Sequence, residues 1–294
     1  MFVGDFNGDE QDDLLCHDQA GDRWVVLADA SGHFTGETWR SPAPWCGHPG
    51  AQLFIGDFNG DGRDDMLCHD QAGAKQVALA DESGRFTGAD WSAPMAWCGH
   101  GGAALFVGDF DGDSRDDMLC HDQAGDTWIA LADPSGQFPE NSWFESMGWC
   151  HHEGAELFIG DFNGDGRDDM LCHDRAGDES VAFANESGEF SGPSWSSPLN
   201  WCDSEGAQLS IGDFNGDLRD DMLCHDPAGA KWLALADASG QFTGTSWYAP
   251  MEWCAVAGGE LYIGKFNSDK RSDMLCHDPS GYMWISNARE DGSF

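Results

Sequence analysis

Positive charge is scarce in this sequence. The 294 residues include 14 Lys and Arg against 53 Asp and Glu, which gives a formal net charge of −39 and a pI near 4.1. Nucleic acids and anionic membrane surfaces attract proteins through a basic face, and this chain has too few basic residues to build one. We therefore expect no nucleic-acid partner.

Long apolar runs and a basic N-terminal region are also missing. No stretch approaches the roughly 20 apolar residues that a membrane helix needs, so we expect no membrane insertion. The N-terminus shows neither the basic nor the apolar segment of a signal peptide. The 11 cysteines, however, are regularly placed, as in proteins of oxidising compartments. We expect a secreted, extracellular protein whose leader was removed before this numbering begins.

A repeat of 52 residues organises the chain. Gly-Asp-Phe-Asn-Gly-Asp begins at Gly4, Gly56, Gly160 and Gly212, and variants of it begin at Gly108 and Gly264. Leu-Cys-His-Asp follows in all six units, and Trp-Cys follows in the first five. A fixed period without insertions indicates a repeat architecture.

Each unit carries four strand signals separated by Gly-containing turns. In the second unit we expect strands over 53–58 and 65–69, and in the fifth unit over 231–236 and near Trp247. Four short strands in each period are typical of a propeller blade, whereas the coils of an open solenoid are usually shorter and need caps. We predict an all-β, six-bladed β-propeller of 52-residue repeats. It forms a single domain over 1–294, with blades starting near residues 1, 53, 105, 157, 209 and 261.

The sixth unit is incomplete. It ends at Phe294, which aligns with Phe34, so its fourth strand and its Trp-Cys pair are missing. We expect the third strand, over 283–288, to have an exposed edge, and such edges recruit other strands. We therefore predict that another chain or a longer precursor fills this edge, with self-association as one result. A three-stranded blade or a fragment are the alternatives.

The loop between the first two strands has the pattern of a cation site. Over 57–65, oxygen-bearing side chains occupy loop positions one, three, five and nine, and a backbone carbonyl is available at position seven. Ca²⁺ accepts such an all-oxygen shell more readily than Mg²⁺, which demands octahedral geometry. A solvated acidic turn is the alternative, but carboxylates this close repel one another without a cation.

Five loops carry this pattern, and we predict about five Ca²⁺ ions. The expected ligands, with position seven contributing its carbonyl, are Asp5, Asn7, Asp9, Gln11 and Asp13; Asp57, Asn59, Asp61, Arg63 and Asp65; Asp109, Asp111, Asp113, Arg115 and Asp117; Asp161, Asn163, Asp165, Arg167 and Asp169; and Asp213, Asn215, Asp217, Arg219 and Asp221. Position six wants a left-handed residue, yet it is Glu10, Ser114 and Leu218 in three loops. In the sixth loop Lys265 replaces the first Asp, so we expect no metal there.

The G-D-F-N-G-D-G-R-D-D pattern resembles the FG-GAP (VCBS) repeat, a family that includes the calcium-bearing propeller of integrin α-subunits and a mushroom propeller lectin. The resemblance covers all six units. It implies a calcium-stabilised propeller, usually extracellular, that serves adhesion or glycan recognition. It does not imply particular ligand-binding residues, because those lie in the variable loops of this family.

The cysteine spacings alternate between 30 and 22 residues. A Cys16–Cys46 bridge would cross the third strand, near twice the ~4.8 Å strand spacing and beyond the usual Cα range of ~4.4–6.8 Å. We therefore predict the shorter pairing, with Cys16 left over: Cys46–Cys68, Cys98–Cys120, Cys150–Cys172, Cys202–Cys224 and Cys254–Cys276. A zinc site of Cys46, His48, Cys68 and His69 is the alternative, but the last two units lack the equivalent of His48.

Histidine and tryptophan recur beside these cysteines. Every second-strand His precedes an Asp, as in His69-Asp70, but sixfold recurrence without a nucleophile motif favours a structural role over acid–base catalysis. The Trp of each Trp-Cys pair, such as Trp97, could stack on a sugar or cap a disulfide, and we favour the cap.

These features predict a binding module and no enzyme. Near-identical blades present near-identical clefts, and weak sites gain by avidity. We expect a multivalent lectin-like or adhesion protein that binds a glycan or an extracellular protein ligand. An extracellular assembly protein linked through the sixth blade is the alternative. A polysaccharide-degrading enzyme is the third reading, against which the lack of an asymmetric polar cluster counts.

Overall fold

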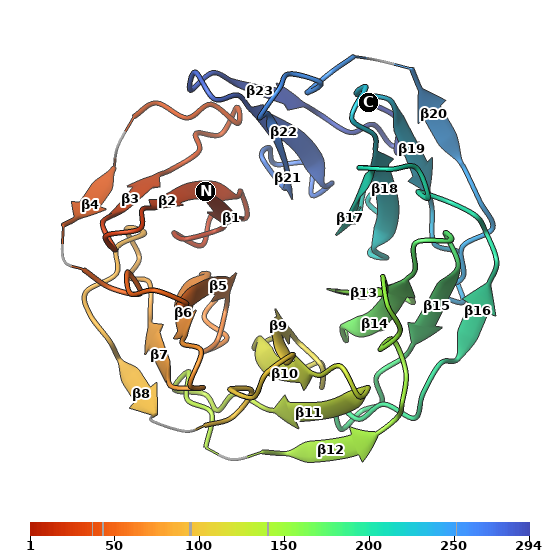
Figure 1. The fold of residues 1–294 in the computed structure, drawn as a ribbon. Coiled ribbons are helices and arrows are strands. Elements are labelled where there is room, and N and C mark those ends of the chain that lie inside the picture. The colour runs from red at the N-terminus through yellow and green to blue at the C-terminus, as the bar shows by residue number, and fades with distance from the viewer. Residues whose placement is uncertain (37, 43, 94–95, 140, 251) are drawn as a thin grey trace. The chain divides into compact units, whose positions relative to one another are not determined.

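The computed structural model describes residues 1–36, 38–42, 44–93, 96–139, 141–250 and 252–294. These residues form 23 β-strands in six antiparallel sheets, and in each sheet the strands follow one another in sequence order (Figure 1). Five sheets have four strands and one has three. The prediction of an all-β, six-bladed propeller with an incomplete sixth blade is confirmed.

The second strand of each blade supplies more buried residues than any other strand, whereas the first strand is mostly half-buried. The first strands are β1 (Phe2–Gly4), β5 (Gln52–Gly56), β9 (Ala104–Gly108), β13 (Glu156–Gly160), β17 (Gln208–Gly212) and β21 (Glu260–Gly264). The second strands are β2 (Asp13–His17), β6 (Asp65–His69), β10 (Asp117–His121), β14 (Asp169–His173), β18 (Asp221–His225) and β22 (Asp273–His277). Four of the second strands, β6, β10, β14 and β18, are buried at every residue, as strands covered on both faces are.

The third and fourth strands lead outward to solvent. The third strands are β3 (Arg23–Val26), β7 (Lys75–Ala78), β11 (Asp126–Ala130), β15 (Glu179–Ala182), β19 (Lys231–Ala234) and β23 (Met283–Ser286). The fourth strands are β4 (Trp39–Ser41), β8 (Trp91–Ala93), β12 (Trp143–Ser146), β16 (Trp195–Ser197) and β20 (Trp247–Ala249). Four of the five fourth strands alternate half-buried and exposed residues, as an edge strand with one covered face does, whereas β12 is half-buried only at Trp143.

The predicted ends of one strand in the second blade and one in the fifth blade were wrong. The first strand of the second blade ends at Gly56 instead of residue 58, because the Asp57 carboxylate already accepts the N–H of Gly60 and turns the chain. The third strand of the fifth blade ends at Ala234, and Ala236 forms only an isolated bridge to Phe242.

Residue contacts divide the chain into two compact units, Met1–His151 with Glu186–Glu189, and His152–Asn185 with Phe190–Phe294. In the first unit β1, β5 and β9 lie side by side, and in the second unit β13, β17 and β21 do so. The core of each unit lies between successive blades. There a loop Phe packs edge-to-face on a Phe of the next blade, as in Phe58–Phe138 at 5.6 Å and Phe162–Phe242 at 5.7 Å. The prediction of one domain over 1–294 stays a prediction.

The sixth blade ends on β23. Its residues Met283 and Trp284 are 40% and 45% exposed, and Tyr282 just before them is 67% exposed. The strand stops at Ser286 and does not extend to residue 288 as expected. Whether another chain pairs with this strand stays a prediction. The described residues include no helix long and apolar enough to cross a membrane.

Candidate metal loops and rim pockets

The loop over 57–65 is wound around its own side-chain oxygens. The Asp57 carboxylate accepts the N–H groups of Gly60, Asp61 and Gly62 at 2.8, 3.1 and 2.7 Å. Asn59 Oδ1 accepts the Asp61 N–H at 2.9 Å. The side chains at positions one, three and five therefore turn into the same loop. The bonds to the first Asp recur in the loops that begin at Asp5, Asp109, Asp161 and Asp213.

Position nine is the most deeply buried carboxylate of the loop. Asp65 is fully buried and accepts the N–H groups of Phe58 and Ala80 at 3.2 and 2.7 Å. Burial raises the pKa of Asp65 to about 8, and the pKa values of its equivalents Asp13, Asp117, Asp169 and Asp221 are raised to about 8 for the same reason. A bound cation would favour the ionised carboxylate and lower these pKa values again.

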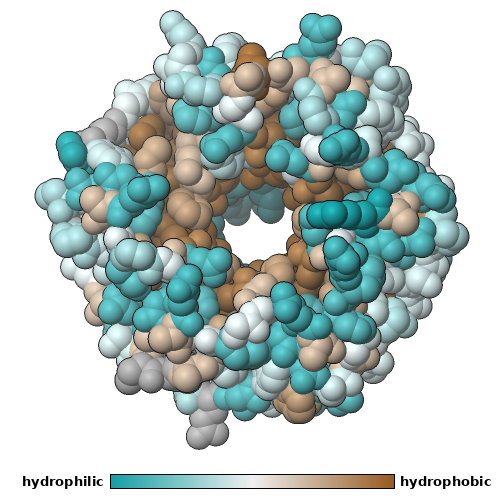
Figure 2. Space-filling view, in the orientation of Figure 1, coloured by the Kyte–Doolittle hydropathy of each residue, from teal (hydrophilic) through white to brown (hydrophobic). Residues whose placement is uncertain are grey.

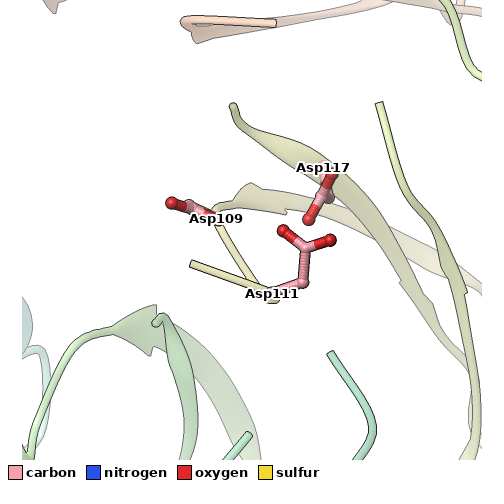
Figure 3. A group of neighbouring side chains, drawn as sticks. All are labelled: Asp109, Asp111 and Asp117. Carbon is pink, nitrogen blue, oxygen red and sulfur yellow. The ribbon is translucent and has the colours of Figure 1, made fainter. Parts of the chain in front are cut away.

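Loop three fits a cation best. Single carboxylate oxygens of Asp109, Asp111 and Asp117 lie within 4.8 Å of one another (Figure 3). Asp111 Oδ1 is buried and has no hydrogen-bond partner. In loop two this position is Asn59, whose amide donates to Asp61 at 3.0 Å, and an ionised Asp cannot donate in that way. Burial raises the pKa values of all three carboxyls.

The arginine at position seven does more than the sequence suggests. Only its carbonyl was expected to matter, but the Arg63 guanidinium contacts the Asp61 carboxylate, and its Nε donates to the Ala80 carbonyl at 3.2 Å. Arg115, Arg167, Arg219 and Arg271 make the same pair of contacts. Loop one has Gln11 instead, whose Oε1 is buried without a partner. Each arginine therefore compensates the charge of one loop carboxylate.

Position six is left-handed in every loop, as expected. The φ angles of Glu10, Ser114 and Leu218 are 64°, 66° and 66°, close to 78° and 82° at Gly62 and Gly166. A side chain costs energy in this conformation, so these three loops carry a strain that loops two and four avoid.

Loop six lacks the central acceptor. Lys265 replaces the Asp that gathers three N–H groups elsewhere. The Asp269 N–H still donates to Asn267 Oδ1, and the Asn267 amide donates to Asp273, both at 2.8 Å. The positive charge of Lys265 also works to lower the pKa of Asp220, although desolvation outweighs it and raises that pKa to about 7. This loop keeps part of its shape without the ligand set of the other five.

Position eight, which sequence reasoning overlooked, joins neighbouring blades. The Asp64 carboxylate accepts the N–H of Asp5 at 2.8 Å, and the Asp64 N–H donates to the Asp5 carbonyl at 2.7 Å. A Cβ on Gly4 would lie 2.5 Å from Asp64 Oδ2, so only glycine fits before Asp5. The available signal was the Gly-Asp that opens each loop together with the Asp-Asp that ends it.

The disulfide prediction is confirmed. Cys46–Cys68, Cys98–Cys120, Cys202–Cys224 and Cys254–Cys276 are bridged, each with a Cα–Cα distance of 5.5 Å, and Cys150 and Cys172 are also disulfide-bonded. Cys16 alone among the described cysteines forms no disulfide. The zinc interpretation fails because disulfides consume the thiolates that it required.

Three of the five tryptophans of the Trp-Cys pairs, Trp45, Trp97 and Trp253, lie over buried cations. Lys75 Nζ lies 5.0 Å from the centre of the Trp97 ring and donates to the Gly73 and Trp97 carbonyls at 2.9 and 2.6 Å. Lys231 repeats this arrangement under Trp253, and Arg23 lies 5.1 Å from the Trp45 ring. These three rings pack on cations, and the choice between a disulfide cap and sugar stacking stays a prediction.

The second-strand histidines contact the third strand. His121 bonds Thr127 at 3.0 Å and His173 bonds Glu179 at 2.8 Å. Beside Lys75, burial and then the lysine charge lower the pKa of His69 to about 4. The Asp that follows each His orders a turn, as Asp70 does by accepting the N–H groups of Ala72 and Ala74. These contacts support the structural interpretation of the His-Asp pairs.

Two pockets in the first unit are copies of each other, one repeat apart. One has a volume of about 560 Å³ and the other about 430 Å³. His69, Gln71 and His100 line the larger pocket, and His17, Gln19 and His48 line the smaller one at equivalent positions. Glycines and alanines form most of the remaining wall. Hydrophilic residues also cover much of the face shown in Figure 2.

The chain belongs to the FG-GAP-like repeat family. That family matches residues 5–68, 57–120, 109–172 and 161–224, which together span well over half of the chain. The resemblance inferred from the loop motif is therefore confirmed. No curated protein matches the chain in sequence.

Three solved structures share the fold. A lectin from Agrocybe aegerita, described as specifically recognising non-reducing terminal N-acetylglucosamine, is 18% identical with a TM-score of 0.66, over 100% of this chain and 77% of its own. The BP39L lectin of Burkholderia pseudomallei is 17% identical with a TM-score of 0.53, over 96% and 79%. The Photorhabdus luminescens Tc holotoxin pore is 14% identical with a TM-score of 0.65, over 97% of this chain and 13% of its own. At these identities the likeness concerns the fold alone.

Proposed function

We propose that this chain is a secreted glycan-binding propeller, without enzymatic activity, that holds sugars in its repeated rim pockets. The observation that carries the proposal is the recurrence of one pocket at a one-repeat interval with the same His and Gln side chains. Imidazole and amide groups both donate and accept hydrogen bonds, as sugar hydroxyls do. Two lectins share the fold, and the five disulfides support an oxidising environment.

Glycine gives the larger pocket its shape. Gly50 has a φ angle of 83°, and a Cβ at this position would lie 2.4 Å from Gln71 Cδ. Any residue larger than glycine at position 50 would therefore displace the Gln71 side chain from the pocket wall. The His100 ring is held by Asp122, with 3.2 Å between Nε2 and Oδ2. The polar groups of the pocket are therefore positioned before a ligand arrives, which reduces the entropy lost on binding.

A glycan array tests this proposal. We expect the chain to bind one family of glycans, and Gln71→Ala and His100→Ala to weaken that binding about tenfold each. Gln76→Ala, in the neighbouring strand β7 but outside the pocket lining, is the matched control and should bind as the parent does. Absence of binding to every glycan on the array would reject the proposal.

We also propose that five loops bind Ca²⁺. Loop three supports this, because its carboxylates converge and Asp111 Oδ1 has no partner. The ion would supply the positive charge that the clustered acids need, held by the side chains at positions one, three, five and nine and by the carbonyl at position seven. Calorimetric titration of the chelated protein should give about five sites, and Asp61→Ala should remove one of them. A titration that shows no Ca²⁺ uptake would reject this assignment.

Assembly through the sixth blade is a second candidate function. The exposed Tyr282, Met283 and Trp284 at β23 favour it, since an apolar edge strand is a site for strand addition. Light scattering over a hundredfold concentration range should show dimers or larger species, and Trp284→Lys should reduce them. A chain that stays monomeric at every concentration would reject assembly through the sixth blade, and glycan binding would remain as the proposed function.

A further inference from the structure

Pairs of aromatic residues occupy one cross-strand position in blades three and five. In blade three, Trp128 of β11 pairs with Phe144 of β12, and their rings stack with 5.1 Å between centres. Blade five repeats the stack with Trp232 and Tyr248 at 5.3 Å. Blades two and four have Gln76 with Ser92 and Ser180 with Ser196 at the same positions. Because blades two and four form the same sheet without this aromatic pair, the fold does not require it.

One ring of the stack in blade three is exposed to solvent. Phe144 is 48% exposed, whereas Trp128 is partly buried against the core between blades two and three. A large aromatic ring left in water gives up the stabilisation that burial would provide. Single exposed apolar residues are common on protein surfaces. Exposure alone therefore does not give Phe144 a role in binding, and its distance from a binding pocket must be considered.

His100 connects this stack to the larger rim pocket. Its ring lies edge-on to Trp128 with 5.4 Å between centres, and the same side chain lines the pocket of about 560 Å³. The pocket wall therefore continues, through His100 and Trp128, to the open ring of Phe144. At the smaller pocket, which His48 lines, the two positions of the stack are Gln76 and Ser92. The two pockets thus match in their lining but differ in what lies beside them.

We propose that the larger pocket and the Trp128–Phe144 stack form one extended site for an oligosaccharide. One sugar occupies the pocket, and a later sugar of the same glycan lies with its C–H face against the ring of Phe144. A pyranose has one apolar face of C–H groups and a rim of hydroxyls, so a polar pocket and an exposed aromatic ring suit its two kinds of surface. This inference rests on the proposed glycan-binding function and adds that the ligand is longer than a monosaccharide.

Glycan length is the variable that tests the proposal. The probes are a monosaccharide, a disaccharide, a trisaccharide and a tetrasaccharide that share the terminal sugar bound most strongly on the array, each titrated by calorimetry. We expect the parent chain to bind the longer probes about tenfold more tightly than the monosaccharide. Phe144→Ala should remove that gain and leave monosaccharide affinity unchanged. Thermal melting of the variant checks that this surface substitution leaves the fold intact.

Tyr248→Ala is the matched control. Tyr248 is equally exposed and stacks on Trp232 in the same way, but Ser204 stands where blade three has His100. Its loss should therefore not change the length preference. The converse variant, Gln76→Trp with Ser92→Phe, should add a length preference at the smaller pocket.

The outcomes separate this inference from the proposed function. A length preference that Phe144→Ala abolishes and Tyr248→Ala retains supports the extended site. Equal affinity for all four lengths, or a length preference that survives Phe144→Ala, overturns the extended site and leaves monosaccharide binding in the pocket. A parent chain that binds no glycan on the array rejects the proposed function, and the extended site with it.

Discussion

The metal-loop end and the rim end of each blade differ in how much their buried residues vary from blade to blade. At the loop end, position nine is a buried Asp in all six blades. At the rim end, the residue beside the second-strand His changes almost every time, and the series is Arg23, Lys75, Thr127, Glu179, Lys231 and Met283. All but Met283 are buried. Burial alone therefore does not explain why one end stays constant.

The difference lies in the number of groups that each end must satisfy. A loop brings several carboxylates to one point, and only a narrow arrangement of ligands, cation and N–H donors satisfies them together. At the rim, one His and nearby carbonyl oxygens need a partner, and an ammonium, a hydroxyl or a carboxylate can each provide one. Lys75 donates to the Trp97 carbonyl, whereas Glu179 pairs with His173. Variation is therefore concentrated at the rim, where the candidate binding pockets also lie.

The largest expected effect comes from removing metal at the loop end. If the five loops bind Ca²⁺, excess chelator should lower the melting temperature by more than about 10 °C. A site filled at a hundred times its Kd stabilises the fold by ~2.7 kcal/mol, and 1 kcal/mol corresponds to about 2–4 °C in a domain of about this size. Scanning calorimetry with and without chelator measures the shift. A melting curve that does not move would mean that the loops are stable as acidic turns.

Breaking one rim disulfide should cost less. Each bridge joins residues separated by 22 positions, and closing a loop of that size stabilises the fold by ~3 kcal/mol. The double variant Cys46→Ser with Cys68→Ser should lose about that much in urea unfolding. Cys16→Ser, which removes a thiol outside any disulfide, is the control and should change little. Equal stability of the double variant and the control would show that the bridge does not constrain the rim.

The rim histidines should respond to pH with opposite signs. Burial and Lys75 lower the pKa of His69 to about 4, so its contribution to stability is complete above the unfolded pKa of ~6.5 and is lost as the pH falls toward 4. The Glu179 hydrogen bond and charge raise the pKa of His173 despite its burial, so its contribution is present below ~6.5 and is lost as the pH rises through the folded value.

Unfolding measured between pH 4.5 and 8 separates the two. His69→Asn should reduce the loss of stability on acidification by ~2 kcal/mol, because each pKa unit corresponds to ~1.4 kcal/mol. His173→Asn should make acidification more damaging. The groups facing His173 are Glu179, Glu156 and Asp174, and all of them favour its protonated form. The same pH response in both variants would contradict the assigned partners.

The smallest effect compares two loops. Without metal, Asp111→Asn should stabilise the fold by ~1 kcal/mol, because it removes a buried acceptor that has no partner and supplies the amide that Asn59 provides in loop two. Asn59→Asp should have the opposite sign. Urea unfolding in chelator measures both. With Ca²⁺ present, Asp111→Asn should instead weaken binding, and a variant that binds the ion more tightly would contradict the ligand assignment.

Several features of the site followed from the sequence because they depend on spacing within one repeat. Asp57, Asn59 and Asp61 are close in the chain, so a tight turn brings them together whatever surrounds it. The disulfides followed from strand spacing, since only the 22-residue pairing avoids crossing the third strand. The contact of Arg63 with Asp61 was missed because it depends on a rotamer choice that the Ala80 carbonyl stabilises from the third strand side.

The sequence by itself determined the number of blades, the loops with their candidate ligands, and the cysteine pairing, because a strict period repeats the same local distances in every unit. Only the tertiary structure decided which side chains from different blades meet. Asp64 reaches Asp5, and His100 reaches Trp128, although neither pair is close in the sequence. Such contacts depend on how closely successive sheets pack and on the rotamers that this packing allows, and neither quantity is written in the repeat.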